Sequence, residues 1–223
     1  TILRYNGSIW SSMASGVSGY LNGLWGSSAS DVFAVGSGGM IVHYDGSTWS
    51  AMISYQTRSQ LNGVWGSSPS DLFTLGSNGA ILHYNGSAWS TMTSGTTTQL
   101  NGVWGSSSSD VFAAGAGGVL LHYNGSSWSS MASGVLTYLY GVHGTSATDV
   151  FCVGDSGTIL RYNGSIWSSM ASGTAERLYG VWCNSSSDVF AAGGNGTILH
   201  YNGSSWSEMT SGTTDNLLSL WGS

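Results

Sequence analysis

An aspartate is followed twelve positions later by a histidine or an arginine five times along this 223-residue chain. The pairs are Asp31 and His43, Asp71 and His83, Asp110 and His122, Asp149 and Arg161, and Asp188 and His200. Carboxylates and imidazoles bind metals, and they also form charge-assisted hydrogen bonds. Successive pairs belong to different repeats, so the histidines cannot converge on one ion. We therefore interpret each pair as a bond that fixes a hairpin, and we expect no metal site.

Serine runs lie beside these pairs, but no histidine or carboxylate converges on them in a way that would activate a hydroxyl group. The sequence therefore predicts a protein that is not an enzyme. We expect no cofactor for the same reason.

The pairs follow a repeat that covers the whole chain. Variants of YNGSSW begin at Tyr5, Tyr44, Tyr84, Tyr123, Tyr162 and Tyr201, at intervals of 39 or 40 residues. Variants of LNGVWGSS begin at Leu21, Leu61, Leu100, Leu139, Leu178 and Leu217. A fixed period of this length indicates an array of one supersecondary unit.

Each unit divides into four short pieces, seen in one copy as LNGVWG, VFAAG, VLLHY and SSWSSM. These pieces are rich in β-branched and aromatic residues and have strand length. The Asn-Gly step between the last two pieces, as at Asn124 and Gly125, predicts a two-residue type I′ hairpin. A four-stranded unit of about 40 residues, repeated, is typical of a β-propeller blade.

The strand count favours six blades over five. The chain begins with a third and a fourth strand, continues through five complete units and ends with a first strand, so the closing blade would lack one strand. The predicted single domain, 1–223, divides into closing strands at 1–15, blades at about 18–53, 60–93, 99–132, 138–171 and 177–210, and a closing first strand at 216–223. A linear β-solenoid is the alternative.

Composition limits the partners of such a fold. Only 6% of the residues are charged, lysine is absent and the formal net charge is −6, which disfavours nucleic acid. No run approaches the ~20 apolar residues of a membrane span. Cys152 and Cys183 replace small or aliphatic residues of other copies, and we interpret them as incidental, with a disulfide as the alternative. Because Thr1 opens in mid-repeat, we expect a fragment or processed product. As a separate expectation, the protein acts outside the cell or at its surface.

The copies differ most in two connections, those between fourth and first strands and those between second and third strands. With antiparallel strands in order, both lie on one face of the disc, and variable loops on a rigid scaffold often carry binding sites. The candidate ligand-binding residues there are Tyr20, Tyr55, Gln56, Arg58, Gln60, Gln99, Tyr138, Glu176, Arg177, Asp215 and Asn216. The alternative is that these loops tolerate drift.

The tryptophans of the fourth strands are candidate platforms on which sugar rings could stack. They are Trp49, Trp89, Trp128, Trp167 and Trp206. The alternative is that a large aromatic residue repeated in every blade packs between sheets.

The stretch GVWGSSSSDVFAAGAGGVLLHYNGSSW resembles the short blades of bacterial propeller proteins, and its VWG and YNGSSW elements are similar to tectonin-type repeats. It lacks the Trp-Asp ending of WD40 blades and the double-glycine pattern of kelch blades. The resemblance implies a secreted, multivalent lectin that binds a glycan, but no sugar-binding residue carries over.

The alternative function is a structural or protein-interaction scaffold, with a protein ligand on the variable face or with self-association through the incomplete blade. Six nearly equal sites would favour the lectin. A single asymmetric patch around Tyr55, Arg58, Glu176 and Arg177 would favour a protein partner.

Overall fold

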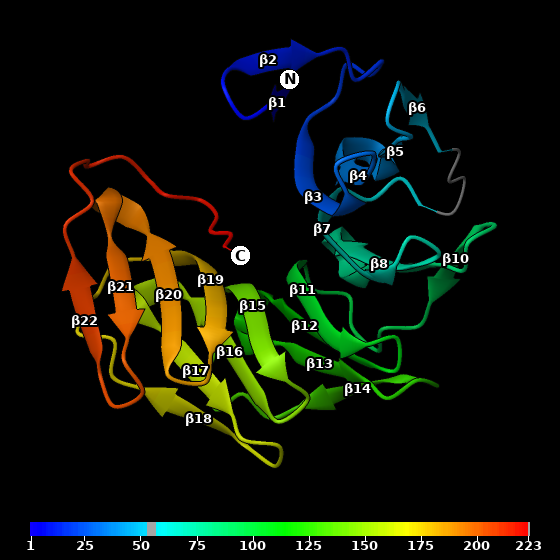
Figure 1. Ribbon diagram of the computed structural model, residues 1–223. Coiled ribbons are helices and arrows are strands. Elements are labelled where there is room, and N and C mark those ends of the chain that lie inside the picture. Colours follow the sequence, from blue (N-terminus) through cyan, green and yellow to red (C-terminus); the bar gives the residue numbers. More distant parts are fainter. Residues whose placement is uncertain (53–56, 223) are drawn as a thin grey trace.

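The protein is a six-bladed β-propeller, and the computed structural model describes residues 1–52 and 57–222 (Figure 1). Five blades are four-stranded antiparallel sheets, and the closing blade contributes a two-stranded sheet. The first strand of each complete blade lies toward the centre of the ring, and the strands then follow one another outward in chain order. The repeat period thus predicted the architecture.

The bounds of the strands repeat from blade to blade. The first strands are β3 (Leu21–Ser28), β7 (Leu61–Ser68), β11 (Leu100–Ser107), β15 (Leu139–Ser146) and β19 (Leu178–Ser185). The second strands are β4 (Asp31–Gly36), β8 (Asp71–Gly76), β12 (Asp110–Gly115), β16 (Asp149–Gly154) and β20 (Asp188–Gly193). The third strands are β5 (Ile41–Tyr44), β9 (Ile81–Tyr84), β13 (Leu120–Tyr123), β17 (Ile159–Tyr162) and β21 (Ile198–Tyr201). The fourth strands are β6 (Trp49–Ala51), β10 (Trp89–Met92), β14 (Trp128–Met131), β18 (Trp167–Met170) and β22 (Trp206–Met209).

A short 3₁₀ turn joins the second and third strands of each complete blade. These turns are η1 (Ser37–Gly39), η2 (Ser77–Gly79), η3 (Ala116–Gly118), η4 (Asp155–Gly157) and η5 (Gly194–Gly196). Their last residue is always glycine with a positive φ, because a Cβ there would collide with the connection to the next blade. At Gly118 it would lie 2.0 Å from the carbonyl oxygen of Val135.

The core consists of separate layers between neighbouring blades. Phe33, Phe73, Phe112 and Phe151, from the second strands, are at most 2% exposed. The Phe73 ring meets Trp128 of the next blade at a centroid distance of 6.1 Å, with the planes at 80°. Each sheet therefore buries its apolar faces against its neighbours, and the array of repeats becomes a ring.

The hairpin between the third and fourth strands differs from the predicted type I′ turn. Tyr123 pairs with Trp128, so the tip has four residues, 124–127. Gly125 has φ +90°, whereas Asn124 is not in the positive-φ region. The Oδ1 atom of Asn124 instead accepts hydrogen bonds from the backbone N–H groups of Ser126 and Ser127. Asparagine is thus used as a side-chain acceptor in an Asx turn.

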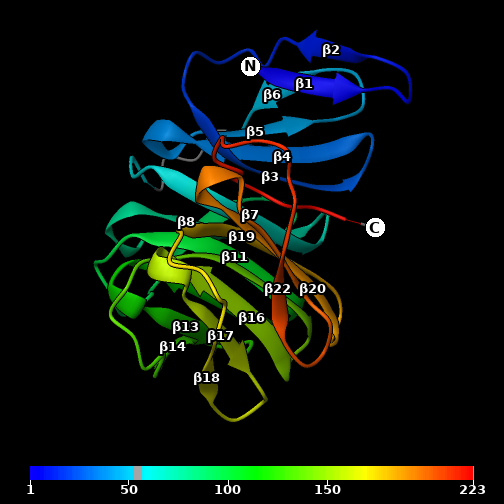
Figure 2. The ribbon, with the colours of Figure 1, turned by 90° about the vertical axis from the view of Figure 1, so that its left-hand side faces the viewer.

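The closing blade contains β1 (Ile2–Tyr5) and β2 (Trp10–Met13), which pair with each other and lie beside β5 of the next blade (Figure 2). The predicted first strand at 216–223 is not a strand over its described residues, 216–222. These residues still run along β19, where the backbone of Ser219 and Leu220 approaches Gly180. In the described part of the chain no second strand lies beside them, so they have no ladder partner.

Candidate functional site

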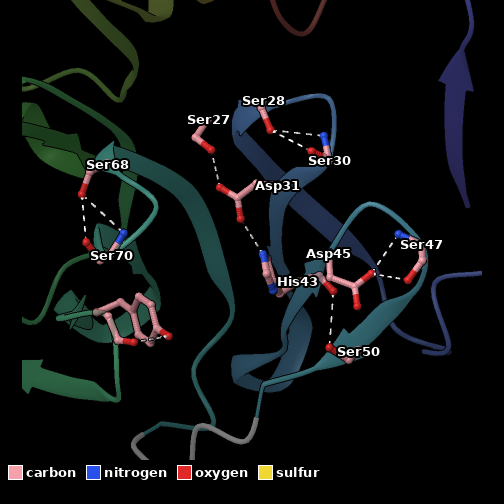
Figure 3. Close-up of polar contacts among 12 residues, drawn as sticks. Ser27, Ser28, Ser30, Asp31, His43, Asp45, Ser47, Ser50, Ser68 and Ser70 are labelled. Carbon is pink, nitrogen blue, oxygen red and sulfur yellow. Dashed lines mark hydrogen bonds and ion pairs between the residues drawn. The ribbon is translucent and has the colours of Figure 1, made fainter.

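The aspartate and histidine pairs lie at the opposite end of the second and third strands from the 3₁₀ turns. His43 Nε2 is 2.6 Å from Asp31 Oδ1, and the other carboxylate oxygen of Asp31 accepts a hydrogen bond from Ser27 (Figure 3). The His43 ring also stacks on Phe33 at 4.3 Å. Three other blades repeat the histidine pair at 2.7 Å, and Arg161 replaces the histidine against Asp149 at 2.8 Å. The interpretation as hairpin bonds is confirmed.

A metal or catalytic role finds no geometric support at these pairs. Among residues 1–52 and 57–222, no group of three or more histidine, cysteine, aspartate or glutamate side chains is placed to hold a metal ion. Each aspartate carboxylate already has two hydrogen-bond partners within its blade. One is a histidine or Arg161, and the other is a serine or threonine hydroxyl group or the Asn184 amide.

The two variable connections do lie together on one face of the ring. The backbone N–H of Ser37 in η1 donates to the carbonyl oxygen of Tyr20, at 2.9 Å. The corresponding bond from Asp155 in η4 to Tyr138 is also 2.9 Å, and the other three complete blades repeat it. These bonds attach each 3₁₀ turn to the segment that enters the same blade. The predicted clustering of variable loops on one face is confirmed.

The candidate loop residues are distributed around this face. Tyr20, Arg58, Gln60, Gln99, Tyr138, Glu176, Arg177, Asp215 and Asn216 all lie in the connections that enter the first strands or the segment 217–222. Tyr55 and Gln56 lie outside the described residues. Arg58 enters β7 and Arg177 enters β19, so the two arginines are three blades apart. The structure therefore does not bring Arg58 into one patch with Glu176 and Arg177.

The tryptophan platforms require a correction. Trp89, Trp128 and Trp167 are only 6–8% exposed. Trp49 is partly buried beside Tyr44, and Trp206 is partly buried against Phe151 of the preceding blade. The rings fill the space between blades because a side chain of this size gains most from burial there. The burial of Trp89, Trp128 and Trp167 leaves these three without an open ring face for a sugar and fits the alternative interpretation as packing residues.

A second repeated contact follows the inner strands of three blades. The side-chain amide of Asn22 donates to the carbonyl oxygen of Leu61 in the next blade, at 2.8 Å. Asn62 makes the same bond to Leu100 at 2.7 Å, and Asn101 makes it to Leu139 at 2.8 Å. These amides connect consecutive first strands around the centre of the ring. In β15 and β19 the asparagine is replaced by Tyr140 and Tyr179.

Within residues 1–52 and 57–222, this replacement creates one aromatic cluster on the loop face. The Tyr140 ring is stacked against Tyr138, with centroids 6.2 Å apart, and is tilted against Tyr179 at 5.7 Å. The guanidinium carbon of Arg177 lies 5.4 Å from the centre of the Tyr140 ring and 5.8 Å from that of Tyr179. We call these four residues, with Asp155 of η4, the tyrosine sector.

Asp155 fixes the polar side of the tyrosine sector. Its Oδ1 atom accepts hydrogen bonds from Arg177 Nε and from the Tyr140 hydroxyl, the latter at 3.3 Å. The hydrogen bond that Arg177 donates to Asp155 raises the pKa of Arg177 above its usual value. Burial, helped by the charge of Asp155, raises the pKa of Tyr140. Tyr140 is therefore a neutral donor at neutral pH, and the guanidinium group lies within cation–π distance of the Tyr140 and Tyr179 rings.

The tyrosine sector is accessible to a ligand although its members are fixed. Tyr138 is 47% exposed and the side chain of Arg177 is 49% exposed. Glu176 precedes Arg177, and its carboxylate lies over Gly194 of η5. A ligand on this sector would meet an aromatic surface, a guanidinium edge and a neighbouring carboxylate.

The two blades that contribute to the tyrosine sector also differ from the others in the core, where two contacting residues are replaced together. A first-strand tryptophan elsewhere lies over a glycine of the next blade: a Cβ on Gly144 would be 2.8 Å from Trp104. At the next interface His143 replaces the tryptophan and Cys183 replaces the glycine. The Cys183 N–H donates to His143 Nδ1 at 3.1 Å, and burial lowers the pKa of His143 to about 4. Both cysteines are free thiols, so the disulfide alternative is wrong.

Comparison with known proteins reveals the fold and nothing finer. No family model matches the chain, and no curated protein matches it. Virginiamycin B lyase from Staphylococcus aureus is similar with TM-score 0.74 and 12% identity, over 85% of this chain and 69% of the lyase. YCF48 from Cyanidioschyzon merolae has TM-score 0.67 and 14% identity, over 88% and 74%. An outer-coat COPII chain has TM-score 0.66 and 17% identity, over 86% and 61%.

These likenesses show the propeller fold. They include an enzyme and a coat component, so the fold alone does not select a function. They give no support to the tectonin-type resemblance, which stays a prediction. The described residues contain no helix of the length and apolarity needed to cross a membrane.

Sequence reasoning selected Tyr138 and Arg177 but missed Tyr140, Tyr179 and Asp155. A signal for the two tyrosines was present, because LYGV replaces LNGV in two of the six copies. Asp155 is likewise the one acidic residue among the second-to-third connections. Their convergence was not visible in the sequence, since the three residues come from two blades.

Proposed function

We propose that this propeller is a non-enzymatic protein-interaction module that binds a polypeptide segment at the tyrosine sector. The observation that carries the proposal is asymmetry. Aromatic and charged residues converge in one sector of the loop face, whereas three blades carry the repeated asparagine contact at the same level of the ring. A single site of this kind suits one protein partner better than a set of equal sugar sites.

The chemistry of the tyrosine sector supports a polypeptide ligand. Tyrosine and arginine are enriched among the residues that contribute most binding energy in protein interfaces. Tyrosine offers a large contact area with few rotatable bonds, and arginine offers a planar set of hydrogen-bond donors. Here the stacking and the Asp155 bonds fix Tyr140 and Arg177 before binding, which lowers the entropy cost of association. Carbohydrate binding has less support, because three of the five candidate tryptophan platforms are buried.

A selection from a displayed library of random linear peptides tests the proposal. We expect peptides that bind the wild-type protein with measurable affinity by titration calorimetry. The double variant Tyr138→Ala/Arg177→Ala is expected to weaken binding more than tenfold, the loss of about 1.4 kcal/mol or more that removal of interface anchors typically causes.

The matched control removes the same two residue types from another part of the same face, in the variant Tyr20→Ala/Arg58→Ala. Both residues are exposed, Tyr20 at 83%, and neither belongs to the tyrosine sector. This variant should bind selected peptides as the wild type does. Equal loss in both variants, or binding to a glycan array with several equal sites and no peptide binding, would refute the proposal.

A further inference from the structure

A second surface of the molecule exposes apolar side chains whose counterparts in the complete blades are buried or partly buried. Leu3 of β1 is 57% exposed, Trp10 of β2 is 67% exposed and Trp221 is 85% exposed. The counterparts of Leu3 are Val42, Leu82, Leu121, Leu160 and Leu199, all at most 3% exposed. The counterparts of Trp10 in three blades are 6–8% exposed, and Trp104, a counterpart of Trp221, is 9% exposed.

Leu3 and Trp221 line a cavity of about 670 Å³. It is lined on one side by residues 1–3, on the other by residues 218–221, and at its base by the first strands around the ring axis. Leu24 of β3 also lines it and is 62% exposed. In each complete blade, the second strand occupies the space between the corresponding first and third strands. We call the surface formed by Leu3, Arg4, Trp10, Leu24 and Trp221 the closing-blade surface.

Arg4 supplies a charge argument for what this surface binds. Its counterpart Arg161 lies opposite Phe151 of the second strand, with its guanidinium carbon 5.0 Å from the ring centre. Arg161 also pairs with Asp149, the first residue of that strand, at 2.8 Å. Arg4 keeps the contact with the next blade, through the Tyr44 hydroxyl at 2.8 Å. Within residues 1–52 and 57–222, however, Arg4 makes no ion pair with a carboxylate.

We propose that the closing-blade surface binds one extended polypeptide segment of six residues. In order, these are aspartate, an aliphatic residue, phenylalanine, a small residue, an aliphatic or small residue, and glycine. The segment pairs antiparallel with the free edge of β1 and continues the blade by strand addition. Its aspartate binds Arg4, as Asp149 binds Arg161. Its phenylalanine lies opposite Arg4 and meets Trp221, as Phe112 meets Trp104 at 6.3 Å.

The pattern follows from the interfaces that the chain already contains. Both faces of a second strand are covered: Val111, Phe112, Ala113 and Ala114 of β12 are at most 1% exposed. A segment with alternating polar residues would bury polar side chains without partners, at a free-energy cost. The fourth residue of the segment, which would face Leu3, must be small to medium in size. In the complete blades, the residues that face the counterparts of Leu3 are alanine, threonine or Cys152. The occupant is therefore apolar on both faces and acidic only at its first residue.

The test uses a fluorescein-labelled synthetic peptide with the sequence of residues 186–195, SSDVFAAGGN, and the intact 223-residue protein. We expect saturable binding by fluorescence anisotropy, and no binding of a scrambled peptide. Arg4→Glu should weaken binding about tenfold, the effect of losing a charge-assisted hydrogen bond and gaining a like charge. Arg58→Glu, the same charge change far from this surface, should leave the affinity unchanged.

A charge exchange separates a specific contact from general damage. The Asp188→Arg form of the peptide should bind wild-type protein weakly and should recover affinity for the Arg4→Glu variant. Trp221→Ala should weaken binding of the unmodified peptide, and the tyrosine-sector variant Tyr138→Ala/Arg177→Ala should not. Far-ultraviolet circular dichroism and thermal unfolding of every variant show that it is folded.

Two results would overturn the proposal. The first is absence of peptide binding at millimolar concentration by protein that is folded. The second is binding that neither Arg4→Glu nor Trp221→Ala changes. Self-association of the protein that the peptide does not reverse, without peptide binding, would show that the surface packs flat against a second copy, and it would exclude strand addition.

Discussion

The blades built from β3 to β14 and those built from β15 to β22 share one fold but differ in how much of the repeat they keep. The first group retains the asparagine that bonds to the next blade and the tryptophan that covers the next glycine. The second group replaces the asparagine with tyrosine in both of its blades, and replaces one tryptophan and glycine pair with His143 and Cys183. The strand pairing nevertheless has the same register in both groups.

The difference shows that a blade interface tolerates exchange when both sides change together. His143 is smaller than tryptophan, and the side chain of Cys183 fills the space that an indole ring occupies in other blades. The backbone N–H of Cys183 donates a hydrogen bond to the His143 imidazole. On the loop face, Tyr140 and Tyr179 gain each other and Arg177 as partners. The asparagines that connect neighbouring blades and the tyrosines of the tyrosine sector thus occupy equivalent positions in different blades.

The largest expected effect comes from restoring only one side of the core exchange. His143→Trp should place an indole against the Cys183 side chain and lower the free energy of unfolding by about 3 kcal/mol, the upper range for overpacking a core. Urea denaturation measures it. The double variant His143→Trp/Cys183→Gly recreates the interface of the other blades and should recover most of the loss. If the double variant is no more stable than the single one, His143 and Cys183 do not depend on each other for packing at this interface.

The pH dependence of stability distinguishes the two groups of blades next. Folding lowers the pKa of His143 from 6.5 to about 4, so the folded protein binds a proton there less readily than the unfolded chain. The resulting stability is full above about pH 6.5 and is lost as the pH falls toward 4. Relative to His143→Trp/Cys183→Gly, the wild type should lose about 2 kcal/mol between pH 8 and pH 5. Urea denaturation of both proteins at each pH cancels the groups that they share, and a constant difference would contradict the lowered pKa.

The smallest effect concerns the asparagine contacts. Asn62→Ala removes the hydrogen bond to Leu100 and should lower the free energy of unfolding by about 1 kcal/mol. Tyr140→Asn restores the repeated residue in β15, with the carbonyl oxygen of Leu178 as its partner, and should change stability less than Asn62→Ala does. Thermal and urea unfolding compare the two. A larger loss in Tyr140→Asn would show that the tyrosine is needed for the scaffold itself.

Much of the fold could be predicted from the sequence, because each blade forms from residues close together in the chain and the same pattern recurs in every blade. The 39- to 40-residue period, the strand lengths and the pairing of Asp31 with His43 all concern residues within one blade or at a fixed spacing. The common face of the variable loops also followed, since antiparallel order alone determines it. The hairpin type did not follow, because Asn-Gly suits a two-residue turn and also a four-residue tip with an Asx bond.

The sequence by itself determined the number of blades, the order of their strands and the residues that repeat in each of them, because these depend on period and strand alternation. Only the tertiary structure decided that Trp89, Trp128 and Trp167 of the fourth strands are buried. It also decided that Tyr140, Asp155, Arg177 and Tyr179 meet in one sector. The physical reason is that burial and convergence depend on contacts between blades, and equal spacing in the sequence carries no information about which neighbouring side chains touch.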